Sequence, residues 1–408
     1  MDSIYRFFLS GLRCVAFLPL KLGPECKLTV LVGDGPMGRT AALEGLALVK
    51  AGMESPEALV ARLARFQEEG PLRRRGSPIM VFAVMVGDEG RKSARFINFH
   101  MVFVIEADGV MRLSCEQLAD PDDSKNPLFM SRGAYYQVKA APQPAWRRER
   151  KAPNLQFLPI DKMVLHTPMP PTAAPVVDRL IQTFRRVEIV FDLNLHRADP
   201  ARPDDAEARA QNIAQEWSAI QAEGEGSWQR ALSLARVVLG PALGALTLTP
   251  AGLAVSFAGD PAPIPAARLP QDQLTWLGTI PLIFQQPHKS LLALDQPERQ
   301  LSPLALATLI RELKRADTPV LITTESNVPL QLLDDPVNGL YVGRMIEPDR
   351  VAYYRPEPGR TREALRRHGD LGWVRASGAI DSILGEPEPY ELPDSATAPD
   401  DKAFVLDV

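Results

Sequence analysis

A short glycine-containing stretch, residues 31–40 with the sequence LVGDGPMGRT, carries the clearest chemical pattern in the chain. Gly33 and Gly38 are separated by four residues, and a basic residue, Arg39, and a hydroxyl residue, Thr40, follow. In loops of this form the backbone N–H groups and the basic side chain hold phosphate groups, while the hydroxyl binds Mg²⁺. The residues that this pattern assigns to binding a cofactor are Gly33, Asp34, Gly35, Gly38, Arg39 and Thr40.

Two residues of this loop differ from the usual pattern. Pro36 stands where a further glycine is usual, and proline brings no N–H group and a fixed φ. Arg39 stands where lysine is usual, and its planar guanidinium is bulkier than an ammonium. Taken alone, the stretch is also typical of an ordinary turn between a strand and a helix. We therefore expect either weak or altered binding of ATP and Mg²⁺, or binding of neither.

The residues on both sides of the loop indicate how it is held. Residues 28–32, LTVLV, form a mostly apolar run that is typical of a buried parallel strand. Residues 40–51 have apolar side chains at helical spacing. The loop is therefore expected at the N-terminus of a helix, where free N–H groups and the helix dipole favour an anion.

The rest of the chain alternates between β-rich and helical segments. Hydrophobic periodicity predicts an antiparallel β-meander over residues 79–118, a loop-like segment over 127–154, and helices over 168–240. After a hairpin over 245–259, helices and strands alternate from 272 to 357. This order predicts an α/β fold with an antiparallel β lobe and an inserted helical lobe.

Several short sequences in this series resemble the motifs of one family in their order and spacing. They are LRCVAFLPLKLGPECKLTVLVGDGPMGRT (12–40), ARAQNIAQEW (208–217), LPQDQLTWLGTI (269–280), LLALDQPERQLSP (291–303), PVLITTESNVPLQLLD (319–334) and GDLGWVRASGAIDSILG (369–385). From residue 6 to residue 385, the chain thereby resembles the ABC-type AAA ATPase heads of the RecF/SMC and overcoming-lysogenization-defect group. The resemblance implies an ABC-ATPase-type P-loop NTPase core.

The resemblance also implies a division of the chain. It implies a single head over residues 1–385, with the phosphate-loop strand, its helix and the β lobe in 1–140. The helical lobe and signature region would occupy 141–275, and the last strands of the core would occupy 276–385. The remaining residues, 386–408, are acidic and rich in proline, a composition that predicts a disordered tail.

The resemblance assigns roles outside the loop as well. Asp295, at the end of an apolar run, would bind Mg²⁺ together with Thr40. Gln296 stands where the family has its general-base glutamate, and an amide cannot accept a proton at neutral pH. Glu325 stands where the family has its switch histidine. The catalytic residues therefore stay unassigned, with Asp295, Gln296 and Glu325 as the degenerate positions.

The signature-like segment consists of Leu269, Pro270, Gln271, Asp272 and Gln273. Pro270 replaces the serine of the family, and Asp272 replaces a glycine, so that a carboxylate would face and repel a triphosphate. Together with the changes in the loop, these departures imply that the chain has kept the fold and lost efficient ATP hydrolysis.

The composition argues against several other classes of protein. The chain has 408 residues and a formal net charge of −4, which gives no overall attraction to nucleic acid. Its three cysteines are too few for a disulfide framework, and its five histidines do not fall at metal-ligand spacing. No run approaches about 18 apolar residues. Because no signal peptide is evident either, we expect a cytoplasmic protein without a membrane span.

The hypothesis that these observations favour is a degenerate ATP-binding protein, either a pseudo-ATPase or a very weak ATPase. It would act as a scaffold or regulatory partner, and the family implies bacterial stress or phage defence as its setting. The expected partner is a second copy of the chain, another ATPase or an effector. Two alternatives stay open: a genuine nucleotide-gated ATPase dimer, and a DNA-binding accessory protein that uses basic groups such as Arg73–Arg75 and residues 146–151.

Overall fold

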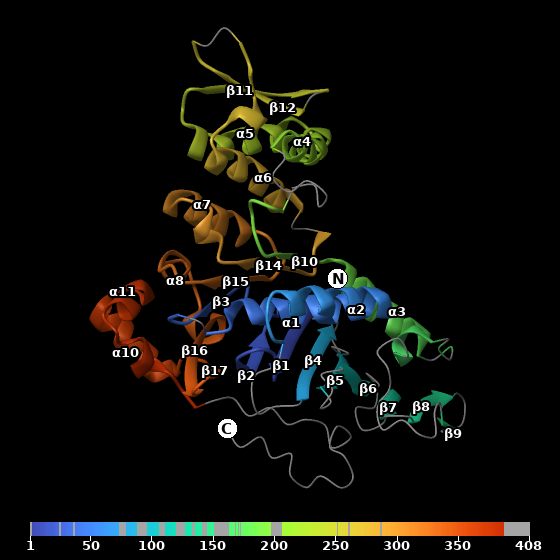
Figure 1. Cartoon of the computed structure of the whole chain (residues 1–408). Helices are drawn as coiled ribbons and strands as arrows, with labels where there is room; N and C mark the ends of the chain where they lie inside the picture. Colours follow the sequence, from blue (N-terminus) through green and yellow to red (C-terminus); the bar gives the residue numbers. More distant parts are fainter. Residues whose placement is uncertain are drawn as a thin grey trace.

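A computed structural model shows how these segments are arranged (Figure 1). It describes residues 2–23, 26–35, 37–72, 79–87, 96–105, 111–119, 127–132, 135–140, 145–150, 163–167, 169, 171, 173–196, 206–250, 252–259, 262–285 and 288–386. Within these residues the strands form one mixed sheet of 14 strands and a second sheet of three.

The part of the large sheet that carries the loop is parallel. Its strands, in spatial order, are β10 (Val187–Val190), β14 (Leu291–Asp295), β15 (Val320–Thr324), β3 (Leu28–Val32) and β16 (Leu340–Glu347). Every residue of β3, β14 and β15 is buried, as in sheets that are covered on both faces. Asp295 pairs with Thr323, and Thr324 pairs with Val32. The carboxyl ends of these three strands therefore meet at one edge of the sheet.

The remainder of the large sheet is mostly antiparallel. It continues from β16 through β17 (Arg350–Tyr354), β2 (Val15–Lys21), β1 (Ser3–Ser10), β4 (Ile79–Gly87), β5 (Ile97–Ile105), β6 (Met111–Ala119), β7 (Pro127–Arg132), β8 (Tyr135–Ala140) and β9 (Ala145–Arg150). Only the contact between β17 and β2 is parallel among the described pairs of this part. The predicted meander is confirmed as β4, β5 and β6, and the β lobe shares one sheet with the parallel core.

Two sequence expectations about local structure are wrong. Within the segment predicted as a loop, residues 127–132, 135–140 and 145–150 form β7, β8 and β9, because each strand pairs with the preceding one and its backbone groups are satisfied in the ladder. Pro127 is the first residue of β7, a position that strands tolerate. Residues 187–190, VEIV, form strand β10 instead of helix, because two β-branched valines and an isoleucine fit the position beside β14.

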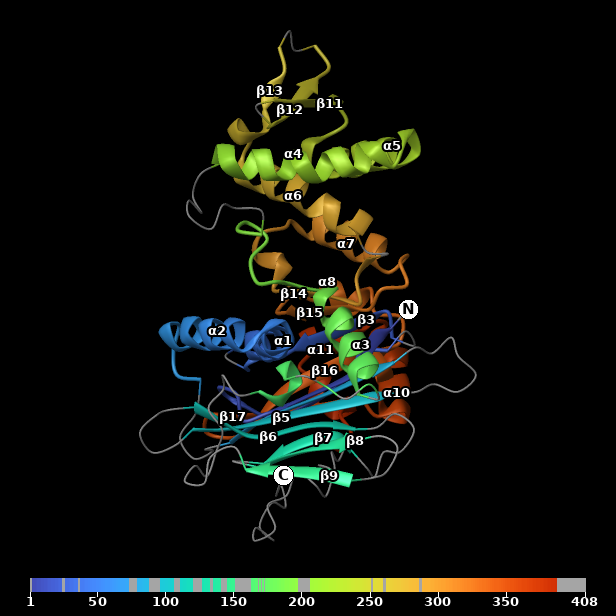
Figure 2. The same cartoon turned by 90° about the vertical axis from the view of Figure 1, so that its right-hand side faces the viewer.

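Helices cover both faces of the sheet. On one face lie α1 (Arg39–Glu54), α2 (Pro56–Glu68) and α3 (Ala174–Arg185), whose apolar side chains share a cluster with those of β1, β4 and β5. Figures 1 and 2 show α1 and α2 lying across the strands. Val30 and Val32 of β3 point to the other face, where they join a second cluster with the remaining helices. The strand before the loop is therefore fixed from both sides.

The helical lobe stands above the second face (Figures 1 and 2). It contains α4 (Ala206–Ala222), α5 (Glu225–Leu239), α6 (Gln271–Gln285) and the small sheet of β11 (Leu243–Thr249), β12 (Gly252–Phe257) and β13 (Ile264–Pro265), with α7 (Pro303–Leu313) between the lobe and the large sheet. Trp217 and Trp276 are fully buried here, and their indole N–H groups donate to Leu277 O and Leu234 O, respectively.

The C-terminal helices are short and lie near β16 and β17 (Figure 1). They are α8 (Val328–Gln331), α9 (Pro336–Gly339), α10 (Pro358–His368) and α11 (Leu371–Ala376), and 3-10 turns occur at Val164–His166, Ala266–Arg268, Pro297–Arg299 and Ile380–Ile383. Residues 387–408, most of the predicted tail, lie outside the described residues. Across the described helices, none is both long and apolar enough to cross a membrane.

Candidate functional site

The glycine-containing loop connects the buried strand β3 to the N-terminus of α1, as the sequence predicts. Gly35 and Gly38 have φ values of 73° and 68°, which favour glycine, and Gly38 is the N-cap of α1. A Cβ atom at Gly38 would lie 2.4 Å from Cys14 Sγ, so this position has no room for a side chain. Pro36 lies outside the described residues.

Arg39 is the first residue of α1, and its side chain is buried, with 5% of the residue exposed. Its guanidinium turns back over the loop, where Nη1 donates to Gly33 O and Nη2 donates to Glu325 Oε1. The Nε atom of Arg39 is buried and has no hydrogen-bond partner among the described residues. The charge of Arg39 is therefore already balanced by Glu325, an ion pair that sequence reasoning missed.

Thr40 and Asp295, the predicted ligands of Mg²⁺, lie next to each other. Thr40 Oγ1 donates to Asp295 Oδ2 at 2.9 Å, and Thr323 Oγ1 donates to Asp295 Oδ1. Burial raises the pKa of Asp295, and the hydrogen bonds from Thr323 and Thr40 offset part of that rise. A hydroxyl and a carboxylate oxygen at one point suit Mg²⁺, which prefers oxygen ligands.

Gln296 follows Asp295 in a left-handed conformation, with φ 44° and ψ 55°. Its backbone N–H donates to Thr323 O at 3.0 Å, which fixes the turn after β14. Glu298, two residues further, accepts from the backbone N–H of Glu325 at 2.6 Å. The ends of β14 and β15 are thereby joined beside the loop.

A cavity of about 580 Å³ lies in front of the loop. It is lined by the loop and the start of α1, by the turn at Arg13 and Cys14, by residues 69–71, and by Gln296, Arg299 and Glu325. This volume falls in the usual range of small-molecule sites. The structure thus brings most of the predicted loop residues, Gln296 and Glu325 around one space.

The charges that line this cavity balance one another. They comprise three arginines, Arg13, Arg39 and Arg299, and three glutamates, Glu44, Glu69 and Glu325. Arg13 pairs with Glu44, with Nη2 at 2.8 Å from Oε1, and Arg39 pairs with Glu325. Arg299 is exposed and has no ion pair with a described residue. It lies within the motif at residues 291–303, and its place in that motif is the sequence signal that could have indicated it.

A contact from the C-terminal region holds the loop from its other side. Arg375 of α11 donates to Asp34 Oδ1 at 2.8 Å and to Glu325 O at 2.8 Å. Tyr353 of β17 donates to Met37 O at 2.8 Å. The sequence does not predict either contact, because Arg375 and Tyr353 lie far along the chain from the loop residues to which they bond.

The signature-like residues lie elsewhere. Leu269, Pro270, Gln271, Asp272 and Gln273 stand at the start of α6 in the helical lobe, and none of them lines the cavity. The side chains of Gln271 and Asp272 are exposed. Within one chain, the structure therefore does not bring this segment to the phosphate loop.

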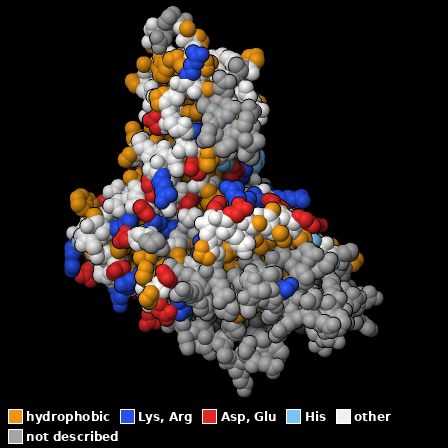
Figure 3. Space-filling view, in the orientation of Figure 1, with side chains coloured by type: hydrophobic (Ala, Val, Ile, Leu, Met, Phe, Trp, Pro, Cys, Tyr) orange, Lys and Arg blue, Asp and Glu red, His pale blue; other side chains and the backbone are white. Residues whose placement is uncertain are grey.

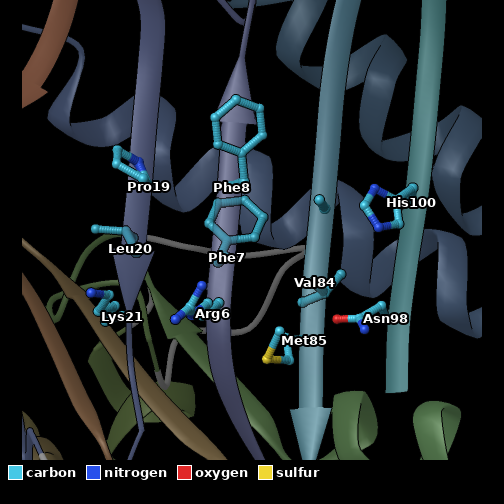
Figure 4. Close-up of a pocket in the computed structure, with 11 residues that line it drawn as sticks. Arg6, Phe7, Phe8, Pro19, Leu20, Lys21, Val84, Met85, Asn98 and His100 are labelled. Carbon is cyan, nitrogen blue, oxygen red and sulfur yellow. The ribbon is translucent and has the colours of Figure 1, made fainter. Parts of the chain in front are cut away.

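A second cavity, of about 80 Å³, lies in the β lobe and contains none of the predicted site residues. Figure 4 shows His100 and Asn98 on β5, with Arg6 on β1 and Lys21 on β2. His100 is 5% exposed, no described residue bonds to its Nδ1, and burial lowers its pKa to about 4. The imidazole is therefore neutral at pH 7.

The parallel strands, the glycine loop before α1 and the carboxylate at the end of β14 define an α/β fold of the P-loop NTPase type. One strand, β15, separates β3 from β14, so the loop and the carboxylate face each other across its end.

No protein-family model and no curated protein sequence matches the chain. Among solved structures, one similar to it is an Smc head bound to the C-winged helix domain of ScpA, with 12% identity, a TM-score of 0.49, and 88% of this chain and 99% of that chain covered. A second is an Smc head with an extended coiled coil bound to the C-terminal domain of ScpA from Pyrococcus furiosus, with 11% identity, a TM-score of 0.48, and coverage of 90% and 99%. A third is an Smc head with a coiled coil and joint from Pyrococcus yayanosii, with 10% identity, a TM-score of 0.42, and coverage of 90% and 99%. With TM-scores below 0.5, these likenesses assign neither an activity nor a partner.

Proposed function

We propose that this chain is a degenerate ABC-type head that binds a nucleoside phosphate and hydrolyses it very slowly or not at all. The observation that carries the proposal is the cavity in front of the loop, with Thr40 and Asp295 beside it and an amide, Gln296, after the carboxylate. The ordered series of motifs along the chain adds support. Its biological role would be that of a scaffold or regulatory partner.

The residues fit a phosphate group and a cation only in part. Backbone N–H groups at the start of α1 and the exposed guanidinium of Arg299 suit phosphate oxygens. When bound, Mg²⁺ would supply charge neutralisation between those oxygens, with Thr40 and Asp295 as its ligands. Glu325, by contrast, brings a negative charge into the same cavity.

Slow hydrolysis follows from the state of the carboxylates around the cavity. A general base has to accept a proton from water, and the amide of Gln296 cannot. Asp295 already accepts from Thr40 and Thr323, and Glu325 is paired with Arg39. Glu44 is paired with Arg13, and Glu69 is paired with Arg65, so each of these carboxylates already has a partner.

The test is ligand binding and turnover with the full chain. We expect millimolar Mg-ADP or Mg-ATP to raise the melting temperature, because a ligand at about 100 times its Kd stabilises a protein by roughly 2.7 kcal/mol. Thr40→Val, which keeps the side-chain shape and removes the hydroxyl, should reduce this shift when Mg²⁺ is present. Phosphate release should stay near the rate of a no-protein control. If neither nucleotide changes the melting temperature, the binding proposal fails, and fast phosphate release would contradict the proposed loss of hydrolysis.

A nucleotide-gated dimer is the second candidate, and one observation favours it. The signature-like segment at the start of α6 is exposed and stands apart from the cavity of its own chain. It could face a phosphate only from a second chain, which would be another copy or a related ATPase. Light scattering with and without Mg-ATP tests this, because a mass that doubles with nucleotide would support the dimer.

DNA binding has less support. In the view of Figure 3, basic and acidic side chains are interspersed over the described surface. Arg73–Arg75 lie outside the described residues, and β9 contains most of residues 146–151.

A further inference from the structure

The carboxylate of Glu325 pairs with the cation that the proposed site would otherwise offer to a phosphate. Glu325 directly follows β15, the strand between β3 and β14, and its side chain reaches Arg39 at the start of α1. It lines the cavity and accepts from Arg39 Nη2. The side chain of Arg39 is 4% exposed and that of Glu325 is 51% exposed. Of the two, the negative group is the one that a ligand in the cavity would meet.

The position of Arg39 shows why its contact with Glu325 matters for phosphate binding. In phosphate-binding loops of this spacing, the basic residue at the start of the helix reaches the last phosphates of the nucleotide, while the loop holds the inner ones. Arg39 lies over the loop, since it donates to Gly33 O at the first residue of the pattern. Its second donor is directed to Glu325, which is the same kind of oxygen anion as a phosphate.

We propose that Glu325 is a built-in anion that occupies the place of a terminal phosphate, so that the cavity takes a nucleoside diphosphate in preference to a triphosphate. This inference rests on the proposed nucleotide binding and names the ligand class of that site. A third phosphate would compete with Glu325 for Arg39 and would add charge to a cavity whose lining arginines and glutamates already balance. A diphosphate leaves the ion pair of Arg39 and Glu325 intact.

The backbone around Glu325 is held so that the carboxylate stays at this place. Its N–H donates to Glu298 Oε1 at 2.6 Å, and its carbonyl accepts from Arg375 at 2.8 Å. Thr323, two residues earlier, bonds to Asp295. Since both peptide groups of Glu325 are bonded, a triphosphate could displace the carboxylate only by rotating the side chain.

The experiment is calorimetric titration of the full chain with ADP and with ATP, each with Mg²⁺. For the wild type we expect ADP to bind at least about tenfold more tightly than ATP. Glu325→Gln keeps the shape and an acceptor for Arg39 but removes the charge, so ATP should gain about tenfold and ADP should change by less than about threefold. Glu363→Gln removes the same charge from an exposed position on α10 and should leave both affinities unchanged.

The outcomes separate the inference from the function on which it rests. If the wild type binds ATP as tightly as ADP, Glu325 is not a substitute for phosphate, while the proposed nucleotide binding stands. If ADP is preferred but Glu325→Gln leaves the preference unchanged, Glu325 is not its cause and the inference is again overturned. If neither nucleotide binds to the wild type or to the variant, the proposed function fails and the inference fails with it. The ratio of the ADP and ATP affinities of the wild type alone decides the first case, even if the variant does not fold.

Discussion

At the scale of single residues, the site is defined by charges that satisfy one another. Arg39 is buried and bonds to Gly33 O and Glu325, while Glu325 stays half exposed. This asymmetry sets the cost of removing either side chain. Without Glu325, the buried cation of Arg39 keeps one neutral partner, Gly33 O, among the residues that the structure describes. Without Arg39, the carboxylate can turn toward water.

The asymmetry leads to a prediction for two variants. We expect Glu325→Ala to lower the free energy of unfolding by roughly 1–3 kcal/mol, because it leaves part of a buried guanidinium without a partner. We expect Arg39→Met, which fills a similar volume without charge, to cost less than about 1 kcal/mol. Urea unfolding of both variants and the wild type measures the difference. A larger loss of unfolding free energy for Arg39→Met than for Glu325→Ala would show that the unpaired guanidinium is not the cause of the destabilisation.

His100 gives a second prediction at this scale. Its pKa is lowered from 6.5 to about 4 by burial, so between these values the unfolded chain binds a proton that the folded chain does not. Stability therefore rises with pH across this window and falls on acidification. From pH 7 to pH 5, His100 should account for a loss of roughly 2 kcal/mol in the free energy of unfolding. The same acidification should lower the free energy of unfolding of His100→Gln by correspondingly less.

Urea unfolding at the two pH values measures this difference. His288→Gln, at an exposed histidine, is the control and should keep the wild-type loss. Arg6 and Lys21 line the same cavity (Figure 4), and the lowered pKa of His100 comes from its burial. An unchanged pH dependence in His100→Gln would contradict the assignment.

At the scale of elements, the strand, loop and helix around residues 28–54 are the part that the sequence predicts best. A buried five-residue strand, a glycine pattern and a helical period are all local signals, and they fix where the loop lies. Strands β7, β8 and β9 are not predictable in this way, because they form by pairing with neighbouring strands and their own hydrophobic pattern does not indicate them. The pair of Arg39 and Glu325 is equally hidden, since 286 positions separate the two residues.

Two of the three loop glycines, Gly35 and Gly38, allow a matched test of this element. Both have positive φ, but a Cβ atom at Gly35 would meet open space, whereas one at Gly38 would meet Cys14 Sγ and Val15 Cγ2. Gly35→Ala should cost only the strain of a left-handed alanine, roughly 1–2 kcal/mol. Gly38→Ala should cost clearly more, because either the loop or β2 has to shift.

Thermal unfolding of these variants and of Cys14→Ala/Gly38→Ala measures the steric part. The double variant should recover some of the stability that Gly38→Ala loses, because one of the two clashing atoms is gone. Equal losses for Gly35→Ala and Gly38→Ala would mean that the contact with Cys14 does not constrain the loop.

At the scale of the whole molecule, the C-terminal helices and the N-terminal loop form one unit. Arg375 bonds to Asp34, 341 positions away, and to the carbonyl of Glu325 after β15. Its side chain is 12% exposed, while that of Asp34 is 83% exposed. The ion pair is therefore worth little, and the bond to the carbonyl supplies most of the link. We infer that α11 limits how far the loop and the end of β15 can open.

This link predicts a local change in mobility. Arg375→Met should raise amide hydrogen exchange in residues 33–35 and 325–327 by about fivefold, because about 1 kcal/mol of local stabilisation is lost. Exchange in β5, far along the sheet, should stay the same. Arg366→Met, at an exposed arginine on the neighbouring helix α10, is the control and should change neither region. Increased exchange in β5 as well would indicate general destabilisation. No increase at residues 33–35 would show that the loop is held by β3 and α1 alone.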